Sequence, residues 1–208
     1  MNEREVKGSE GATAIVLASG RGVRIGGPKA LLAWTRGQSL IEAHVVARET
    51  DCKRVVIVTR PDIALRIGSR ARTARVVISE EPDDLGPAGS IGAAIAAGAL
   101  AGMPFSLITP VDVPPANASV VASLLDALKL GATAARPCFG QRRGHPVAVR
   151  VDALVSAYVS NQRPPLREVL RALHERCRDV ETDQADILVD LDTPEAYEAR
   201  MGCPPSFL

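Results

Sequence analysis

The stretch AIVLASGRGVRIGGPK, residues 14–29, is the part of the sequence that decides the fold class. Its first four residues form a short apolar run that is typical of a buried strand. The glycines that follow allow backbone amides to approach phosphate oxygens that a Cβ atom would keep away. Arg24 and Lys29 add positive charge that can offset the charge of a pyrophosphate leaving group. The stretch therefore predicts a strand and a loop that bind a nucleoside triphosphate.

The glycine-rich stretch has two alternative interpretations besides a triphosphate-binding loop. It could be a purely structural turn or a dinucleotide-binding loop. A Rossmann-type loop passes directly into a helix whose N-terminus receives a pyrophosphate. Here the chain runs instead through Pro28 into Lys29, and no helix-forming run follows at once. An NAD(P)-dependent oxidoreductase would also carry an acidic ribose ligand directly after the second strand, where this chain has Arg60-Pro61. These features favour a triphosphate over a dinucleotide.

The composition is that of an ordinary globular protein. Of its 208 residues, 46% are hydrophobic and 24% are charged, and the net charge is +1. Because no basic run accompanies this balance, we expect no nucleic-acid partner. No apolar run reaches the ~18 residues that a membrane span needs, and the polar first residues are unlike a signal or transit peptide. We expect a cytoplasmic protein with a disordered tail over residues 1–11 and a single domain over residues 12–202.

The cysteines are far apart in the sequence and form no CxxC pair. This spacing does not suit zinc, and a disulfide framework is not expected in a chain of this size. We expect reduced thiols in or near the core at all four positions, Cys52, Cys138, Cys177 and Cys203.

Predicted strands and helices alternate along the chain. β-Branched and apolar runs predict strands over residues 54–59, 74–80, 105–110 and 187–191. We expect the β-branched strands to be buried on both faces, as in a parallel sheet. Helical patterns are found over residues 38–50, 61–67, 117–130 and 166–177, and from residues 86 and 194 onward. Residues 132–137 and 146–150 flank a glycine-bearing connection, which predicts an antiparallel excursion. The whole pattern predicts a three-layer α/β/α, Rossmann-like fold with a mixed, mostly parallel sheet.

Three helix starts carry a recognisable cap. Ser39 with Glu42 three residues later forms a predicted capping box. Asn117 is a predicted N-cap, and Thr193 is another, with Pro194 at the first helical position.

Asp112 is the first candidate metal ligand. It lies in TPVDVPP, residues 109–115, where a carboxylate would leave the carboxyl end of a parallel strand, the edge at which open α/β sheets bind ligands. The prolines fix the local backbone, and Mg²⁺ commonly takes one or two carboxylates together with phosphate oxygens. Considered alone, Asp112 could also be an ordinary turn residue. Asp190 or Asp192 is a candidate second ligand, although Asp192 also suits the start of the last helix.

Two further segments are candidates for ligand contacts. Gly89 and Ser90 precede an alanine-rich helix whose free amides suit a phosphate or a base edge, although any capped helix has the same appearance. His145 lies in a stiff Gly-His-Pro turn and is a candidate for facing the acceptor, whereas a lone histidine is more often a packing or surface residue. His44 and His174 fall within predicted helices and are assigned no function.

Together these segments resemble one family. LASGRGVRIGGPKALL, residues 17–32, closely resembles the signature LAxGxGxRMGxxKxLL of MobA-like nucleotidyltransferases, with Ser19 where an alanine is usual. VDVPP resembles the DxP metal aspartate of that family, and GPAGSIGAA matches the place where its members carry a serine before a helix. GHPVAV and DLDTPEAY resemble its GHPVLL and DxDTPEDY elements, so the matches follow in order from residue 14 to 197.

The resemblance implies the nucleotidyltransferase fold and the transfer of a nucleoside monophosphate to a phosphorylated acceptor, with release of pyrophosphate and with Mg²⁺ as cofactor. It implies that Arg24 and Lys29 hold the phosphates and that Asp112 binds the metal. Asp190 and Asp192 stay the further metal candidates on the argument from the residues given above. The nucleotide-binding candidates are Leu17, Ala18, Ser19, Gly20, Gly22, Gly89 and Ser90.

The GHPV element is typical of molybdopterin cytidylyltransferases, the branch that the chain resembles most. This branch implies CTP as the nucleotide, molybdopterin as the acceptor, a molybdoenzyme or its chaperone as the protein partner, and a monomer or homodimer. Its usual GDxGxR stretch is replaced here by NQRPPLR, residues 161–167, in which Arg167 is the remaining candidate for the acceptor, beside His145. A sugar or polyol phosphate therefore stays open as the acceptor, and a non-catalytic nucleotide-binding module stays open as the function.

Overall fold

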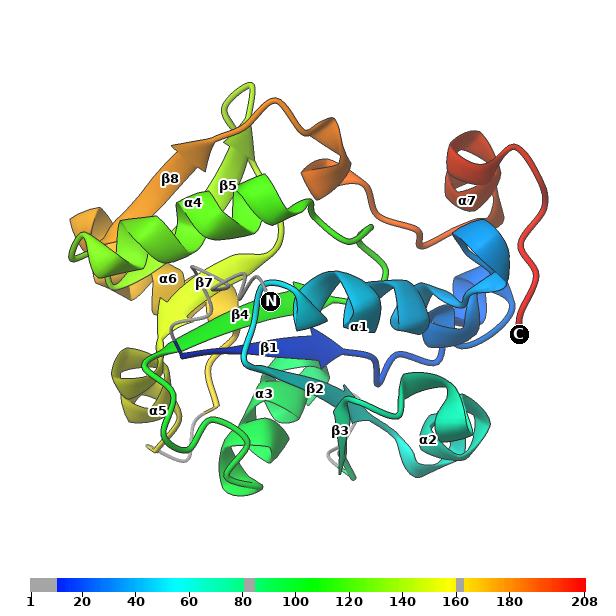
Figure 1. Cartoon of the computed structure of the whole chain (residues 1–208), viewed down its shortest axis with the longest axis horizontal. Coiled ribbons are helices and arrows are strands. Elements are labelled where there is room, and N and C mark those ends of the chain that lie inside the picture. The colour runs from blue at the N-terminus through cyan, green and yellow to red at the C-terminus, as the bar shows by residue number, and fades with distance from the viewer. Residues whose placement is uncertain (1–10, 81–84, 160–162) are drawn as a thin grey trace, which may run out of the picture.

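The computed structural model describes residues 11–80, 85–159 and 163–208, which form a sheet between two layers of helices (Figure 1). The sheet has eight strands in the order β3-β2-β1-β4-β7-β5-β6, and β8 pairs with β5. The strands are β1 (Ala12–Leu17), β2 (Arg54–Thr59), β3 (Arg75–Ile78), β4 (Phe105–Pro110), β5 (Ala134–Phe139), β6 (Arg142–Arg143), β7 (Val147–Arg150) and β8 (Cys177–Glu181). Apart from Gly11, the tail expected over residues 1–11 lies outside the described residues.

The predicted mixed sheet is confirmed. β1 lies between β2 and β4 and is parallel to both, and β3 is parallel to β2. The antiparallel excursion is provided by β7, which runs against both β4 and β5. Since β1 to β4 are mutually parallel, their carboxyl ends meet at one edge of the sheet, and the loops that follow them come together there.

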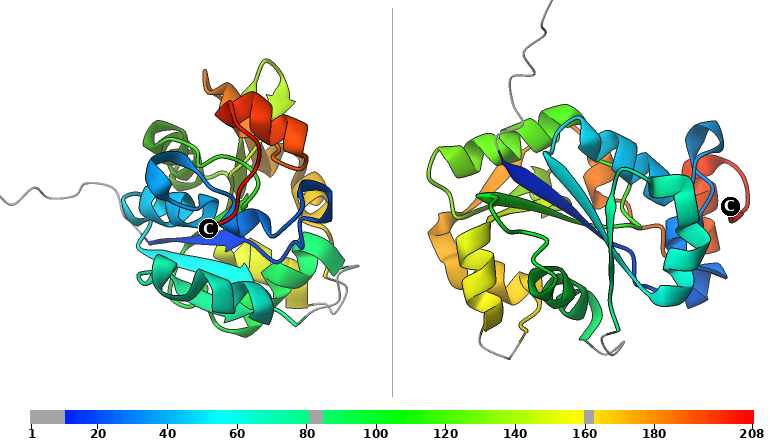
Figure 2. Two further views of the ribbon diagram at one scale, coloured as in Figure 1. Left: turned by 90° about the vertical axis from the view of Figure 1, so that its right-hand side faces the viewer. Right: turned by 60° about the horizontal axis from the view of Figure 1, so that its bottom comes forward.

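Helices cover both faces of the sheet (Figure 2). One face carries α1 (Leu40–Glu49), α2 (Pro61–Ile67) and α4 (Ala118–Lys129), and the other carries α3 (Gly86–Ala96), α5 (Val151–Val159) and α6 (Leu166–Leu173). Side chains of β1 alternate between the two faces, because Val16 belongs to the apolar cluster of α1 and Ile15 to that of α3. The last helix, α7 (Pro194–Met201), adds Tyr197 to the α1 cluster.

The predicted helix caps are confirmed. Ser39 and Glu42 form a capping box at the start of α1. The side chain of Asn117 accepts a hydrogen bond from the Val120 amide at 3.0 Å, and that of Thr193 accepts one from the Ala196 amide at 3.2 Å. These helix starts are decided locally, since each cap satisfies an amide in the first turn of its own helix.

The helix predicted over residues 166–177 is too long. It ends at Leu173, because His174 has a left-handed φ of 46°, and a short 3₁₀ turn follows. Cys177 then begins β8, which pairs in parallel with β5 from the Ala134–Cys177 pair onward. The end of the predicted helix is thus part of a strand, because pairing with β5 outweighs the local preference for a helix.

The strand predicted over residues 187–191 is also wrong. Its first half belongs to the 3₁₀ turn Ala185–Leu188, and residues 189–191 are irregular. Single hydrogen bonds tie this segment to other loops, with the His145 amide donating to the Ile187 carbonyl at 3.1 Å. The expectation that the third strand is buried on both faces is wrong as well, because β3 is an edge strand on which Val76 and Ile78 are 39% and 43% exposed.

The C-terminal residues, for which the sequence supports no prediction, bind back onto the segment after the glycine loop (residues 18–29). The Ala33 amide donates to the Ser206 carbonyl at 2.8 Å, and the Leu208 amide donates to the Leu31 carbonyl at 2.9 Å. A Cβ on Gly27 would lie 2.9 Å from the ring of Phe207. Residues 206–208 therefore pack against the end of the glycine loop and the residues that follow it.

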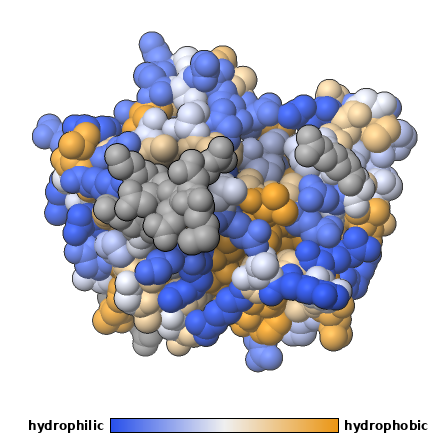
Figure 3. Space-filling model, in the orientation of Figure 1, coloured by the Kyte–Doolittle hydropathy of each residue, from blue (hydrophilic) through white to orange (hydrophobic). Residues whose placement is uncertain are grey.

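The surface in the orientation of Figure 1 is mostly hydrophilic, with hydrophobic residues visible in separate areas (Figure 3). Within the described residues, no helix has the length and apolar character that crossing a bilayer requires. The four cysteines are free thiols. Cys52 and Cys138 are buried and Cys177 is half-buried, but Cys203 is exposed, so its expected place in or near the core is wrong.

Candidate active site

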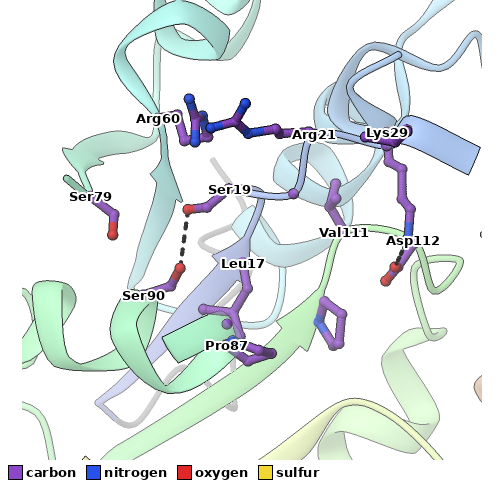
Figure 4. Close-up of a pocket in the computed structure, with 15 residues that line it drawn as sticks. Leu17, Ser19, Arg21, Lys29, Arg60, Ser79, Pro87, Ser90, Val111 and Asp112 are labelled. Atoms are coloured by element: carbon purple, nitrogen blue, oxygen red, sulfur yellow. Dashed lines mark hydrogen bonds and ion pairs between the residues drawn. The ribbon is translucent and has the colours of Figure 1, made fainter. Parts of the chain in front are cut away.

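A cavity of about 390 Å³ lies at the carboxyl edge of the parallel strands (Figure 4). Its walls come from the glycine loop after β1, Arg60 after β2, Ser79 after β3 and residues 110–112 at the end of β4. The start of α3, at Gly86, Pro87 and Ser90, closes one side. Five segments that are distant in sequence thus form one concave site at the edge where open α/β sheets bind ligands.

The glycine loop is folded back on itself around Gly22. The amides of Ile25 and Gly27 both donate to the Gly22 carbonyl at 3.1 Å. Gly22 has a φ of +63°, and a Cβ placed on it would lie 1.8 Å from the Gly27 carbonyl oxygen. Only glycine fits this position, because a side chain would push the two halves of the loop apart.

The nucleotide-binding candidates fall into two groups. Leu17, Ser19, Gly20, Gly22 and Ser90 line the cavity. The Ser90 hydroxyl donates to that of Ser19 at 3.0 Å and so joins α3 to the glycine loop.

The other two candidates, Ala18 and Gly89, are buried and are not among the lining residues. The Ala18 carbonyl accepts a hydrogen bond from the Thr59 hydroxyl at 3.0 Å. Ala18 therefore contributes to the base of the loop, where it joins β1 to the end of β2.

Ionic contacts link the glycine loop to the candidate metal ligands. The Lys29 ammonium Nζ lies 2.5 Å from Asp112 Oδ2 and also donates to Asp192. The Arg24 guanidinium donates to the other carboxylate oxygen of Asp192. The Lys29 side chain is only 14% exposed, so its interaction with the two carboxylates is less screened by water than a surface ion pair.

The three candidate metal ligands come together. Carboxylate oxygens of Asp112, Asp190 and Asp192 all lie within 4.8 Å of one another. Asp190 is exposed as a residue, but desolvation of its carboxyl group and the nearby Asp112 carboxylate raise its pKa. A cation would relieve this like-charge repulsion, and carboxylate oxygens are the ligands that hard divalent ions prefer, so the residues fit a Mg²⁺ or Mn²⁺ ion.

The acceptor candidates lie in different settings. His145 is half-buried, its Nδ1 atom has no hydrogen-bond partner among the described residues, and burial lowers its pKa while Asp112 acts to raise it. Gly144 beside it must be glycine, because a Cβ would lie 2.3 Å from the Ile187 carbonyl oxygen. Arg167 is exposed in the first turn of α6 and does not line the cavity. The first two residues of the NQRPPLR stretch, residues 161–162, lie outside the described part of the chain.

Sequence reasoning did not identify Arg60, Ser79 or His44 as site residues. Arg60 and Ser79 line the cavity, and their position immediately after parallel strands was a usable signal. His44 is 1% exposed on the inner face of α1, and its Nε2 lies 3.2 Å from the Val111 carbonyl and 2.9 Å from that of Val113. Burial, followed by the Arg48 charge, lowers the pKa of His44 to about 4.

The chain is similar in sequence to a protein of known name. A molybdenum cofactor guanylyltransferase of Xanthomonas euvesicatoria pv. vesicatoria (strain 85-10) is 33% identical over 113 residues. That alignment covers 54% of this chain and 53% of the relative, so the match spans about half of the relative's length.

Solved structures share the fold. A homologue of Mycobacterium tuberculosis Rv0371c from Mycobacterium sp. strain JC1 has a TM-score of 0.78 at 23% identity, covering 92% of this chain and 95% of the other. Rv0371c in complex with manganese has a TM-score of 0.73 at 19% identity, covering 92% and 98%. The 2-C-methyl-D-erythritol 4-phosphate cytidylyltransferase of Thermus thermophilus has a TM-score of 0.69 at 18% identity, covering 93% and 98%.

The family assignment rests on a longer match. The sequence profile of the MobA-like NTP transferase domain matches residues 14–180, which include the glycine loop, Asp112 and His145. The resemblance found in the sequence motifs is therefore confirmed, and the match favours a nucleoside triphosphate over a dinucleotide as the ligand of the glycine loop. The chain belongs to the family of MobA-like NTP transferase domains.

Proposed function

We propose that the chain transfers the nucleoside monophosphate of CTP to the phosphate of molybdopterin and releases pyrophosphate. The observation that carries the proposal is the cluster of Asp112, Asp190 and Asp192, whose carboxylate oxygens lie within 4.8 Å of one another. Asp112 lines the glycine-loop cavity, and Lys29 contacts both Asp112 and Asp192. This arrangement offers cationic groups for a triphosphate and anionic groups for a divalent ion within one site.

In the proposed reaction an oxygen of the acceptor phosphate attacks the α-phosphorus of the nucleotide. The new bond joins that oxygen to the α-phosphorus, and the bond to the bridging oxygen of the β-phosphate breaks, so that pyrophosphate carries away the electron pair. Little covalent chemistry is required of the protein, which has to align the two reactants and offset charge.

The residues of the chain divide this work. Amides of the glycine loop hold the phosphates, while Lys29 and Arg24 offset the charge that develops on the pyrophosphate. Asp112, Asp190 and Asp192 would hold the divalent ion, which when bound supplies positive charge at the reacting phosphate. Leu17, Ser19 and Ser90 line the part of the cavity that we assign to the nucleoside.

Two choices within this function are open to test. CTP follows from the resemblance of the GHPV element, whereas the curated relative is named a guanylyltransferase, so GTP is the competing nucleotide. Molybdopterin agrees with that relative's name, whereas the replaced stretch around Arg167 keeps a sugar or polyol phosphate as the competing acceptor. His145 and Arg167 remain our candidates for contacts with the acceptor.

The test measures pyrophosphate release in the presence of Mg²⁺ with CTP, GTP, ATP and UTP, each combined with molybdopterin and with sugar and polyol phosphates. Release with CTP and molybdopterin supports the proposal. Release with GTP changes the nucleotide, and release with another phosphate changes the acceptor, while both keep the mechanism. Triphosphate binding without release in any combination would instead favour a non-catalytic nucleotide-binding module.

A further inference from the structure

The segment that carries Asp112 has no regular secondary structure, so its carbonyls need hydrogen-bond donors from outside the sheet. Residues 111–116, VDVPPA, follow the end of β4, and the two prolines contribute no amide. The Val111 amide is bound to the Leu17 carbonyl at 3.0 Å, which joins the segment to β1. The carbonyls on either side of Asp112 belong to Val111 and Val113, and both accept contacts from α1.

Two side chains of α1 supply donors to this segment. His44 Nε2 lies 3.2 Å from the Val111 carbonyl oxygen and 2.9 Å from that of Val113. One turn further along the helix, the Arg48 guanidinium donates to the Ala116 carbonyl. Because carbonyl oxygens only accept, His44 Nε2 carries the hydrogen and shares it between the two residues that flank Asp112.

Burial makes this contact hard to replace. His44 is 1% exposed and Arg48 is 2% exposed, so water cannot substitute for either donor. On the other side of the segment, the Leu191 amide donates to the Asp112 carbonyl at 3.0 Å, one residue before Asp192. The backbone at Asp112 is thus held between α1 and the loop that carries the other two aspartates.

We propose that His44 is a positioning residue that sets the orientation of Asp112 and thereby the affinity of the site for a divalent cation. This inference rests on the proposed function, because it requires Asp112 to be a metal ligand. His44 does not line the cavity, so it acts through the backbone at Asp112 and not on the substrate. Groups that hydrogen-bond a metal-ligating side chain directly change metal affinity by about 10–100-fold when they are removed. His44 acts through the backbone beside Asp112, so we expect the lower end of that range, about 10-fold.

The experiment titrates the purified full-length protein with Mn²⁺ and follows free Mn²⁺ by electron paramagnetic resonance. His44→Gln and His44→Asn form a matched pair. Both are buried neutral amides, but the glutamine nitrogen occupies a position equivalent to Nε2, whereas the asparagine nitrogen ends one bond short. We expect His44→Asn to weaken Mn²⁺ binding by about 10-fold or more and His44→Gln to stay within about 3-fold of the wild type.

Asp112→Asn separates the two hypotheses. Loss of Mn²⁺ binding in Asp112→Asn together with wild-type affinity in His44→Asn would overturn the positioning role and leave the proposed function standing. Wild-type affinity in Asp112→Asn would overturn the metal site itself. A folded His44→Gln protein, checked by circular dichroism, that binds Mn²⁺ about 10-fold more weakly also contradicts the inference, whether or not His44→Asn folds.

Discussion

The ammonium group of Lys29 lies between two carboxylates from distant parts of the chain. Asp112 follows β4, Asp192 precedes α7, and Lys29 contacts both. Three carboxylates in one cluster repel one another, and the Lys29 charge offsets part of this repulsion through its contacts with two of them. Lys29 is therefore expected to act in two ways. It offsets the negative charge of the phosphates, and it holds Asp112 and Asp192 close to each other.

Replacing Lys29 tests this double role. Because one preorganised electrostatic contact is typically worth about 10²–10³-fold in rate, we expect Lys29→Ala to lower kcat by about that factor. Steady-state pyrophosphate release measures the effect, and circular dichroism checks the fold. Lys53→Ala is the control, since Lys53 is exposed at the opposite, amino-terminal end of β2. Near-normal turnover in Lys29→Ala would remove Lys29 from the mechanism.

Gly22 and Gly20 lie in the same loop but differ in the space available for a side chain. Gly22→Ala combines a positive φ with a contact of 1.8 Å, whereas nothing lies within 4 Å of a Cβ on Gly20. We expect Gly22→Ala to lower both stability and activity, with a backbone strain of about 1–3 kcal/mol. Gly20→Ala should leave the melting temperature unchanged and raise KM for the nucleotide. Equal melting temperatures for the two variants would contradict the close packing at Gly22.

His44 makes stability depend on pH. Its pKa in the folded protein is lowered to about 4 from 6.5, so between these values the unfolded chain binds a proton that the folded protein does not. Stability is therefore fully present above about pH 6.5 and falls by about 3 kcal/mol as the pH drops towards 4. Urea unfolding at pH 7 and pH 4.5 measures the change. The His44→Gln variant, which has no such proton to bind, should lose less stability over the same interval.

At the scale of elements, the C-terminal segment and the glycine loop depend on each other. Backbone hydrogen bonds join residues 206–208 to residues 31–33, and the Phe207 ring packs against Gly27. The Tyr197 hydroxyl of α7 donates to the Ala33 carbonyl and so adds a side-chain contact to the same segment. The loop that we assign to the phosphates is thus held by the last residues of the chain.

Phe207→Ala tests this support. Removing the half-buried ring leaves the backbone hydrogen bonds in place but opens a gap behind Gly27, which we expect to cost about 2 kcal/mol and to raise KM for the nucleotide. Thermal unfolding and steady-state kinetics report the two effects. Leu208→Ala is the matched control, because Leu208 shares the backbone pairing and its side chain is 38% exposed. An unchanged KM in Phe207→Ala would show that the loop does not need this contact.

At the scale of the whole molecule, the site exists only in the folded chain. The glycine loop, Arg60, Ser79 and Asp112 follow four different strands, and Asp190 and Asp192 come from a loop near the C-terminus. A ligand that binds this site binds the native state alone, and so it stabilises the entire fold.

Thermal unfolding with CTP and Mg²⁺ measures that linkage. At a nucleotide concentration 100 times Kd, the native state should gain about 2.7 kcal/mol, which for a chain of this length raises the melting temperature by about 5–10 °C. Gly22→Ala should show a smaller rise at the same concentration, because its loop is displaced. An equal rise in both proteins would place the nucleotide away from the glycine loop.

Features that depend on neighbours along the chain follow directly from the order of the residues. Caps at Ser39, Asn117 and Thr193, the β-branched strands and the glycine loop are local, since each satisfies its own hydrogen bonds or steric needs within a few residues. The motifs also indicated the MobA-like family and selected Asp112, Asp190 and Asp192 as metal candidates.

Other strands and contacts formed only because the fold brings distant residues together. Residues 177–181 became β8 because β5 offered a free edge, and residues 187–191 did not become a strand because their amides and carbonyls bind individual loops. The contact of His44 with the segment around Asp112, and the packing of Phe207 behind Gly27, join residues far apart in the sequence. No local pattern encodes such contacts, because their energy comes from groups that only the folded chain brings within hydrogen-bond or packing distance.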